Sequence, residues 1–218
     1  MRKLPKTEQP ASFGFDKPAR ERLIDAAQKM FRFLGIRVAN GLIAHEAHSN
    51  METLVKYFGN GDALISYFIK SLIAESETVW AVITEDHLGD AEAQLRGWLA
   101  TEQESAGLPM QSQMLLARTA AELYEHRKNP NLSEIEQYWQ AERRRVVGLC
   151  RSSGLRDPVD LADKLLLMVH GARNERNAYG AFAPSRLLQQ AGNELLVGHG
   201  ASSLVKVENT VEPKADRA

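Results

Sequence analysis

The sequence predicts an all-α protein in which an N-terminal helix-turn-helix precedes a larger helical body. Two short segments with apolar residues at helical spacing, joined by a polar turn, lie within residues 42–58. Longer segments with the same spacing follow, bounded by prolines, glycines or capping residues. A chain of 218 residues with 44% hydrophobic content can bury a core in one small and one larger unit.

The N-terminal segment, residues 1–17, carries charged residues and prolines without periodicity, and we expect a flexible arm there. The first helix should begin near Pro18, because proline suits the first helical turn, and should end at Gly35. Its apolar positions recur every three or four residues. They form the predicted buried stripe of Leu23, Ala27, Met30 and Phe31.

The helix-turn-helix is predicted as a domain of residues 18–62, with residues 42–58 at its centre. Leu54 and Phe58, one helical turn apart, mark the inner face of its second helix. The inner face of the preceding helix is formed by Ile43, Ala44 and Ala47. An α-helix fits the major groove of B-DNA, and a helix packed across it can anchor the pair to phosphates. The pattern is therefore compatible with DNA binding by this domain, but helix pairs are common and serve many roles.

Polar residues at the ends of both helices are candidate caps. Ser49 or Asn50 can cap the second helix, and with Ser49 as the cap Glu52 would complete a capping box. We favour this capping role for Glu52 over a contact in the groove. Asn40 is the candidate cap of the preceding helix.

The body is predicted to extend from residue 63 to residue 198. Asn129-Pro130 is expected to break the chain, and a capping box formed by Ser133 and Glu136 is expected to open the next helix. The expected helices cover about residues 63–84, 90–104, 113–125, 133–154, 158 onward and 184–198, and residues 199–218 form a polar tail expected to be disordered.

Charge is divided unevenly along the chain. Residues 1–75 contain 11 lysines and arginines against 8 aspartates and glutamates, a net charge of +3; the remainder contains 16 against 20, a net charge of −4. A mildly basic front half is compatible with phosphate binding. The single cysteine, Cys150, allows no intrachain disulfide and suits a reducing cytoplasm. Because no apolar run reaches the length of a membrane span and no secretory signal is recognisable, we expect a cytoplasmic protein without a membrane partner.

Catalytic and metal-binding alternatives lack the residue patterns that they require. The string from His45 to His48 has one residue between Glu46 and the second histidine, whereas a zinc-protease helix needs two. We find no nucleophile with a base and an orienting group, and no glycine-rich phosphate loop. The sequence therefore predicts no catalytic residues, no metal and no cofactor.

The front of the chain resembles the DNA-binding domain of the tetracycline-repressor-like (TetR) family of bacterial transcription regulators. The motifs that carry the resemblance are, in order, Ala26-Ala27-x-x-x-Phe31, Gly35, Ile43-Ala44, Thr53-Leu54 with Phe58, and Asp62 with Leu64. Residues 148–172 resemble, more faintly, the C-terminal region of one TetR subgroup.

This resemblance implies a homodimeric repressor that binds a double-stranded DNA operator and is released by a small-molecule effector. In the family, the last two long helices pair with those of a second subunit, so that two recognition helices reach successive major-groove turns. Carried onto this chain, the resemblance and the polar character of the helix ends give these DNA-contacting candidates: Asn40, Asn50, Met51, Thr53, Lys56 and Tyr57.

Three positions depart from the TetR pattern. Val55 replaces a tyrosine, Gly61 replaces a lysine, and Glu52 replaces a residue that is typically small. Each lost phosphate contact lowers the salt dependence of binding by about one unit. The departures motivate an alternative, in which the dimer has weakened or lost operator binding and serves as a ligand-binding or partner-binding module.

The resemblance also implies an apolar effector pocket in the body. Aromatic and methionine residues at helical spacing are candidates for its wall, although such residues also serve as ordinary core. His170 stands out because it interrupts an apolar run. The candidates are Trp98, Met110, Met114, Tyr124, Trp139 and His170.

Overall fold

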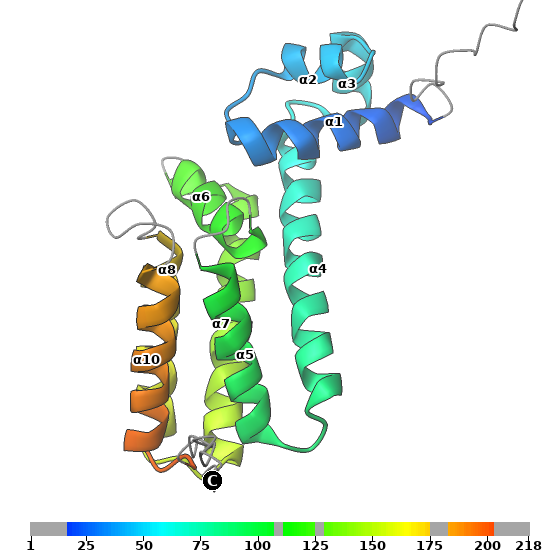
Figure 1. The fold of residues 1–218 in the computed structure, drawn as a ribbon. Coiled ribbons are helices and arrows are strands. Elements are labelled where there is room, and N and C mark those ends of the chain that lie inside the picture. Colours follow the sequence, from blue (N-terminus) through cyan, green and yellow to red (C-terminus); the bar gives the residue numbers. More distant parts are fainter. Residues whose placement is uncertain (1–16, 107–110, 125–128, 175–182, 203–218) are drawn as a thin grey trace, which may run out of the picture. The chain divides into compact units, whose positions relative to one another are not determined.

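The computed structural model describes residues 17–106, 111–124, 129–174 and 183–202. Within these ranges the chain forms helices joined by loops and contains no strand, which confirms the predicted all-α fold class (Figure 1). No helix in the described ranges is both long enough and apolar enough to cross a membrane. Met110, the predicted arm up to residue 16 and the tail from residue 203 lie outside them.

The chain divides into two compact units, and the first contains the predicted helix-turn-helix. Figure 1 shows α1, α2 and α3 grouped around the N-terminal end of the long helix α4. The helices of this unit are α1 (Ala19–Leu34), α2 (Asn40–Glu46), α3 (Met51–Phe58), α4 (Asp62–Asp86), α6 (Ser112–Tyr124) and, up to Glu142, α7 (Pro130–Ser152).

One apolar core runs through the first unit and fixes the helix-turn-helix to the neighbouring helices. Phe31 of α1 is buried, and its ring centre lies 5.5 Å from that of Phe68 in α4. Leu54 of α3, Leu115 of α6 and Ile135 of α7 belong to the same cluster, each fully buried. Burial of a leucine or isoleucine side chain stabilises a fold by about 1.5–3 kcal/mol. The helix-turn-helix therefore draws its stability from α4, α6 and α7 as well as from its own three helices.

The second unit is a separate group of helices. It contains α5 (Ala91–Ser105), α7 from Arg143 onward, α8 (Pro158–Asn174) and α10 (Ala183–Gly198). Helix α10 packs against both α5 and α8. Leu95, Leu161 and Leu196 are fully buried, one from each of these three helices, and form part of the interior.

The start of α7 differs from the prediction. The helix begins at Pro130, and the side-chain oxygen of Asn129 accepts a hydrogen bond from the backbone N–H of Asn131 at 2.9 Å. Proline is suited to the first helical position because no helical hydrogen bond is lost there. Ser133 lies inside the first turn, where its hydroxyl donates to the carbonyl of Pro130 at 2.7 Å. Asn129-Pro130 therefore starts this helix, and the predicted capping box at Ser133 is wrong.

Candidate nucleic-acid interface

The N-terminus of α3 is capped by Asn50 and not by Ser49. Asn50 has an extended backbone (φ −127°, ψ 167°), and its side-chain oxygen accepts a hydrogen bond from the N–H of Thr53 at 2.8 Å. Glu52 consequently occupies the second helical position and is exposed, one position short of the capping-box register. The predicted capping role of Glu52 is wrong, because the competing asparagine takes the cap.

Helix α3 has a buried side and an exposed side. Leu54 is fully buried and Phe58 is 4% exposed, as the spacing of these two residues predicts. On the other side, Val55 is 53% exposed, Tyr57 is 45% exposed, and Lys56 is exposed as well. The helix therefore presents a mixed surface of apolar, cationic and hydroxyl-bearing side chains to the outside.

The turn between α2 and α3 is held by an arginine from α1. His48 lies in this turn, with φ 47° in the left-handed region. The Arg22 guanidinium donates to the carbonyls of Ala47 at 3.0 Å and His48 at 3.3 Å, and also to the carbonyl of Lys17 at 2.8 Å. Since the turn sets the angle between α2 and α3, Arg22 helps to position α3.

Asn40 connects the start of α2 to the loop before α4. The N-cap of α2 is Ala39, which makes no side-chain capping bond, so the predicted capping role of Asn40 is wrong. Its amide nitrogen instead donates to the carbonyl of Asn60 at 3.0 Å. Its amide oxygen would lie 2.7 Å from a Cβ placed on Gly61, which has φ +96°. A side chain at position 61 would therefore meet Asn40 in this conformation.

The predicted DNA-contacting residues thus fall into two groups. Met51, Lys56 and Tyr57 are exposed on the outer side of α3, and Thr53 is half-buried beside them. The side chains of Asn50 and Asn40 each hold part of the backbone in place. For both groups, contact with DNA remains a prediction.

Two cations, one in the helix-turn-helix and one just before it, form ion pairs on its surface. Lys29 contacts Glu46 at 2.6 Å, and its hydrogen bond and charge lower the pKa of the Glu46 carboxyl. Lys17 contacts Asp25 at 2.6 Å, which raises the pKa of Lys17 through the hydrogen bond and the opposite charge. These exposed pairs contribute little to stability, but they reduce the positive charge that the domain presents to phosphates.

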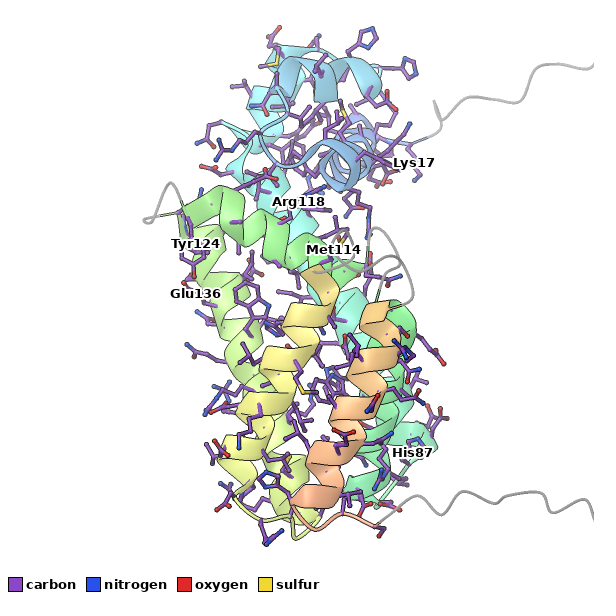
Figure 2. All side chains as sticks on the ribbon, turned by 60° about the vertical axis from the view of Figure 1, so that its left-hand side comes forward. Lys17, His87, Met114, Arg118, Tyr124 and Glu136 are labelled. Carbon is purple, nitrogen blue, oxygen red and sulfur yellow. The ribbon has the colours of Figure 1, made fainter. Side chains whose placement is uncertain are left out.

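Two residues of α6 hold the end of α1 and the connection to α2. The Arg118 guanidinium donates to the carbonyls of Phe31 and, at 2.8 Å, Arg32, which lie in the last turn of α1. The Glu122 carboxylate accepts a hydrogen bond from the N–H of Ile36 at 2.8 Å. Figure 2 shows Arg118 on the part of α6 next to α1. We call these two side chains the α6 clamp.

Sequence analysis missed Arg22 and both residues of the α6 clamp. Arg22 contacts residues 25 and 26 positions away, and the α6 clamp contacts residues 86 and 87 positions away. Periodicity and capping motifs report only on neighbours within about two helical turns. No local pattern in this sequence marks such long-range hydrogen bonds.

The candidate effector-pocket residues are divided between the two units. Met114, Tyr124 and Trp139 belong to the first unit, and Trp98 and His170 belong to the second. Tyr124 is 50% exposed near the end of α6, whereas Trp98 is 1% exposed. Met114 and Tyr124 lie near opposite ends of α6 (Figure 2). A shared pocket for these residues therefore remains a prediction.

Buried polar groups occur in each unit at positions that sequence analysis did not single out. In the first, Tyr138 accepts a hydrogen bond from Gln113, and its burial, with the nearby charge of Glu142, raises its pKa. In the second, Glu102 and Arg173 form a buried ion pair at 2.6 Å. Burying such groups is costly unless they are paired. Apolar periodicity gives no signal for them.

The fold is that of TetR-family transcriptional regulators. Helix α3 follows the short helix α2 after a tight turn, and both are supported by α1 and the N-terminal end of α4. This is the helix-turn-helix arrangement of the class. The chain is similar to a TetR-family regulator from Streptomyces coelicolor, SCO4454, with 20% sequence identity, a TM-score of 0.73, and coverage of 83% of this chain and 95% of the other.

Two further solved structures have the same fold. A transcriptional regulator from a Rhodococcus species shows 17% identity and a TM-score of 0.64 over 85% of this chain and 100% of the other. The ketosteroid transcriptional regulator KstR2 of Mycobacterium tuberculosis shows 18% identity and a TM-score of 0.58 over 84% and 95%. No family profile and no curated protein sequence matches the chain.

Proposed function

We propose that this protein is a DNA-binding transcriptional regulator in which α3 is the recognition helix. The observation that carries the proposal is the two-sided character of α3, with Leu54 and Phe58 buried and Lys56 and Tyr57 exposed. A helix fixed in this way by its inner side leaves its outer side available to enter a major groove. The fold shared with TetR-family regulators supports the proposal.

The regulator acts as a homodimer in this proposal, with α8 and α10 forming the interface. These two helices pack together, and each leaves a large apolar side chain exposed to water. Covering such side chains with a second subunit would bury apolar surface and stabilise a dimer. Leu167 of α8 is 76% exposed and Leu187 of α10 is 47% exposed. A two-fold dimer would place two copies of α3 on successive turns of a duplex.

In this proposal the regulator is a repressor, and a small-molecule effector releases it from its operator. One protein of the same fold is a ketosteroid regulator by name, and one is a multidrug-binding protein. Candidate contacts are the predicted residues, namely Trp98, Met110, Met114, Tyr124, Trp139 and His170. We place this activity in the cytoplasm.

A second candidate function is a dimer that binds a ligand or a protein partner and has weakened or lost operator binding. Val55, Glu52 and Gly61 favour it, because none of them can donate a side-chain hydrogen bond to a phosphate. The ion pairs of Lys17 and Lys29 reduce the available positive charge further.

A gel-shift titration against the DNA upstream of the protein's own gene separates the two candidates. Nanomolar binding to a palindromic site, with much weaker binding to scrambled duplex, is expected for the regulator. Uniform micromolar binding to every duplex, lost as salt is raised, would instead favour the second candidate. If α3 contacts the DNA, Lys56→Ala should weaken binding more than the control variant Lys70→Ala on α4.

A further inference from the structure

Helix α3 consists of four pairs of residues spaced four apart, and each pair has one chemical character. Residues at this spacing lie one above the other on the same side of a helix. The pair of Leu54 and Phe58 is buried in the core. The remaining pairs are apolar, charged and hydroxyl-bearing, and they are Met51 with Val55, Glu52 with Lys56, and Thr53 with Tyr57.

The order of these pairs around the helix follows from 3.6 residues per turn. The charged pair lies opposite the buried pair and so points most directly outward. The hydroxyl pair flanks it on one side, and the apolar pair flanks it on the other. Met51 is 44% exposed and Val55 is 53% exposed, so this apolar pair forms an uncovered edge of α3.

In a major groove, the apolar edge has one strongly favoured base contact. Base pairs present hydrogen-bond donors and acceptors there, and the largest apolar group that they present is the C5-methyl group of thymine. Met51 and Val55 cannot hydrogen-bond to the remaining groups of the base edges in the way that a tyrosine or lysine can. Exposed Lys56 lies one position further along α3 and supplies the charge complementary to the phosphates.

We propose that Met51 and Val55 read thymine methyl groups, so that each half-site of the operator has thymine at the positions facing this apolar edge. The inference rests on the proposed DNA-binding function and adds the chemical identity of the bases. It also gives Val55 a positive role, because the residue that loses a phosphate hydrogen bond gains a contact that specifies sequence.

The test uses duplexes selected by the full-length protein from a library with a randomised central stretch. Each thymine of the selected site is replaced in turn by deoxyuridine, which removes the C5-methyl group and leaves base pairing unchanged. Replacement at the contacted position should weaken binding by the wild-type protein about fourfold per methyl group, the equivalent of one buried methylene. Replacement of thymines outside the protected region should have no effect.

Variants of the protein complete the test. Val55→Ala and Met51→Ala should weaken binding to the thymine duplex and lose the sensitivity to deoxyuridine at one position each. Val82→Ala is the matched control, because Val82 is a valine on α4 with 52% exposure, close to the 53% of Val55. It should behave like the wild type. Melting temperatures of the variants should stay close to that of the wild type, since the truncated side chains are half exposed.

Two results would overturn the inference, and they have different meanings. If the protein binds a selected duplex and no deoxyuridine replacement weakens it, or if Val55→Ala and Met51→Ala keep the full sensitivity, the methyl readout is wrong while the proposed function stands. If the selection enriches no sequence, the proposed function fails and the readout fails with it.

Discussion

Gly61 occupies a backbone position that few other residues tolerate. Its φ of +96° disfavours any residue with a Cβ, and a Cβ there would also meet Asn40 at 2.7 Å. Gly59 also has a positive φ, +58°, but a Cβ on it would meet nothing within 4 Å. A side chain at position 59 would therefore meet backbone strain alone, whereas one at position 61 would meet both backbone strain and a steric contact.

We expect part of the loss of unfolding free energy caused by Gly61→Ala to come from the contact with Asn40, whereas the loss caused by Gly59→Ala comes from the backbone alone. Backbone strain destabilises both variants, and displacing the Asn40 side chain adds a further cost only at Gly61. Urea titrations measure the difference. Adding Asn40→Gly should recover that extra loss in the Gly61→Ala background, and a recovery of the same size with Gly59→Ala would contradict the steric explanation.

Cys150 is fully buried, and burial raises the pKa of its thiol to about 11. The unfolded chain has a thiol pKa near 9. Between these values the native state retains a proton that the unfolded state loses, so the free energy of unfolding falls as pH rises from about 9 towards 11. Below pH 9 this contribution is fully present.

The thiol should therefore resist alkylation by iodoacetamide at pH 8 in the native protein and react readily in urea. Labelling measured by mass spectrometry at increasing urea should follow the unfolding curve. The variant Cys150→Ala should lose part of the alkaline decline in stability. Rapid labelling of the folded protein would show that the thiol is accessible.

At the scale of helices, Arg22 joins α1 to the turn in front of α3. Its three hydrogen bonds to backbone carbonyls use the fork shape of the guanidinium group, which a lysine ammonium cannot reproduce. We expect Arg22→Lys to destabilise the protein by about 1–2 kcal/mol and to weaken operator binding. Thermal unfolding and a gel shift measure the two effects.

A matched replacement, Arg144→Lys, changes an exposed arginine of α7 and should alter neither quantity. If Arg22→Lys lowers the melting temperature but leaves operator affinity intact at a temperature where the variant is folded, Arg22 stabilises the turn without positioning α3.

The α6 clamp makes a second prediction at this scale. Glu122→Ala would leave the half-buried N–H of Ile36 without its acceptor, at a cost of about 1–3 kcal/mol. Glu122→Gln keeps a carbonyl oxygen at the same place and should recover most of that loss. Chemical denaturation of both variants distinguishes the two effects. If Glu122→Gln loses as much unfolding free energy as Glu122→Ala, the charge and not the hydrogen bond is responsible.

The sequence predicted the helices well because the signals that define helices are local. Pro18, Gly35 and the spacing of Leu54 and Phe58 act within a turn or two, and the structure has helix ends and a buried face where they indicate. Asn50, one of the two predicted caps of α3, is the one that the structure shows, and only the capping role of Glu52, which required Ser49, was wrong. Ser49 and Asn50 are adjacent and both suited to the cap. Local chemistry cannot choose between two such neighbours.

The hydrogen bonds that hold the candidate interface could not be predicted in the same way. Arg22, Arg118 and Glu122 are ordinary charged residues on helical segments, and their partners become neighbours only when the chain has folded. The exposed pair of Met51 and Val55 is visible in the sequence, but its exposure depends on which side of α3 the core covers. The sequence therefore predicted the position of α3 and not the hydrogen bonds that support it.

For the whole molecule, the exposed apolar residues of α8 and α10 are expected to be covered by a second copy of the chain. An aspartate placed in such an interface would bury an unpaired charge, which costs several kcal/mol. We therefore expect Leu167→Asp to shift the protein from dimer to monomer in sedimentation experiments. Leu88→Asp is the control, because Leu88 is 84% exposed in the turn between α4 and α5 and should leave the dimer intact.

The same variant links assembly to DNA binding. A dimer engages two half-sites with one loss of rotational and translational freedom, whereas a monomer binds one half-site with about half of the contacts. Leu167→Asp should consequently lose affinity for a two-half-site duplex by about a hundredfold or more while keeping its weak affinity for a single half-site. A monomeric variant that binds the full operator as tightly as the wild type would show that α3 acts alone, and the two-fold arrangement would have to be abandoned.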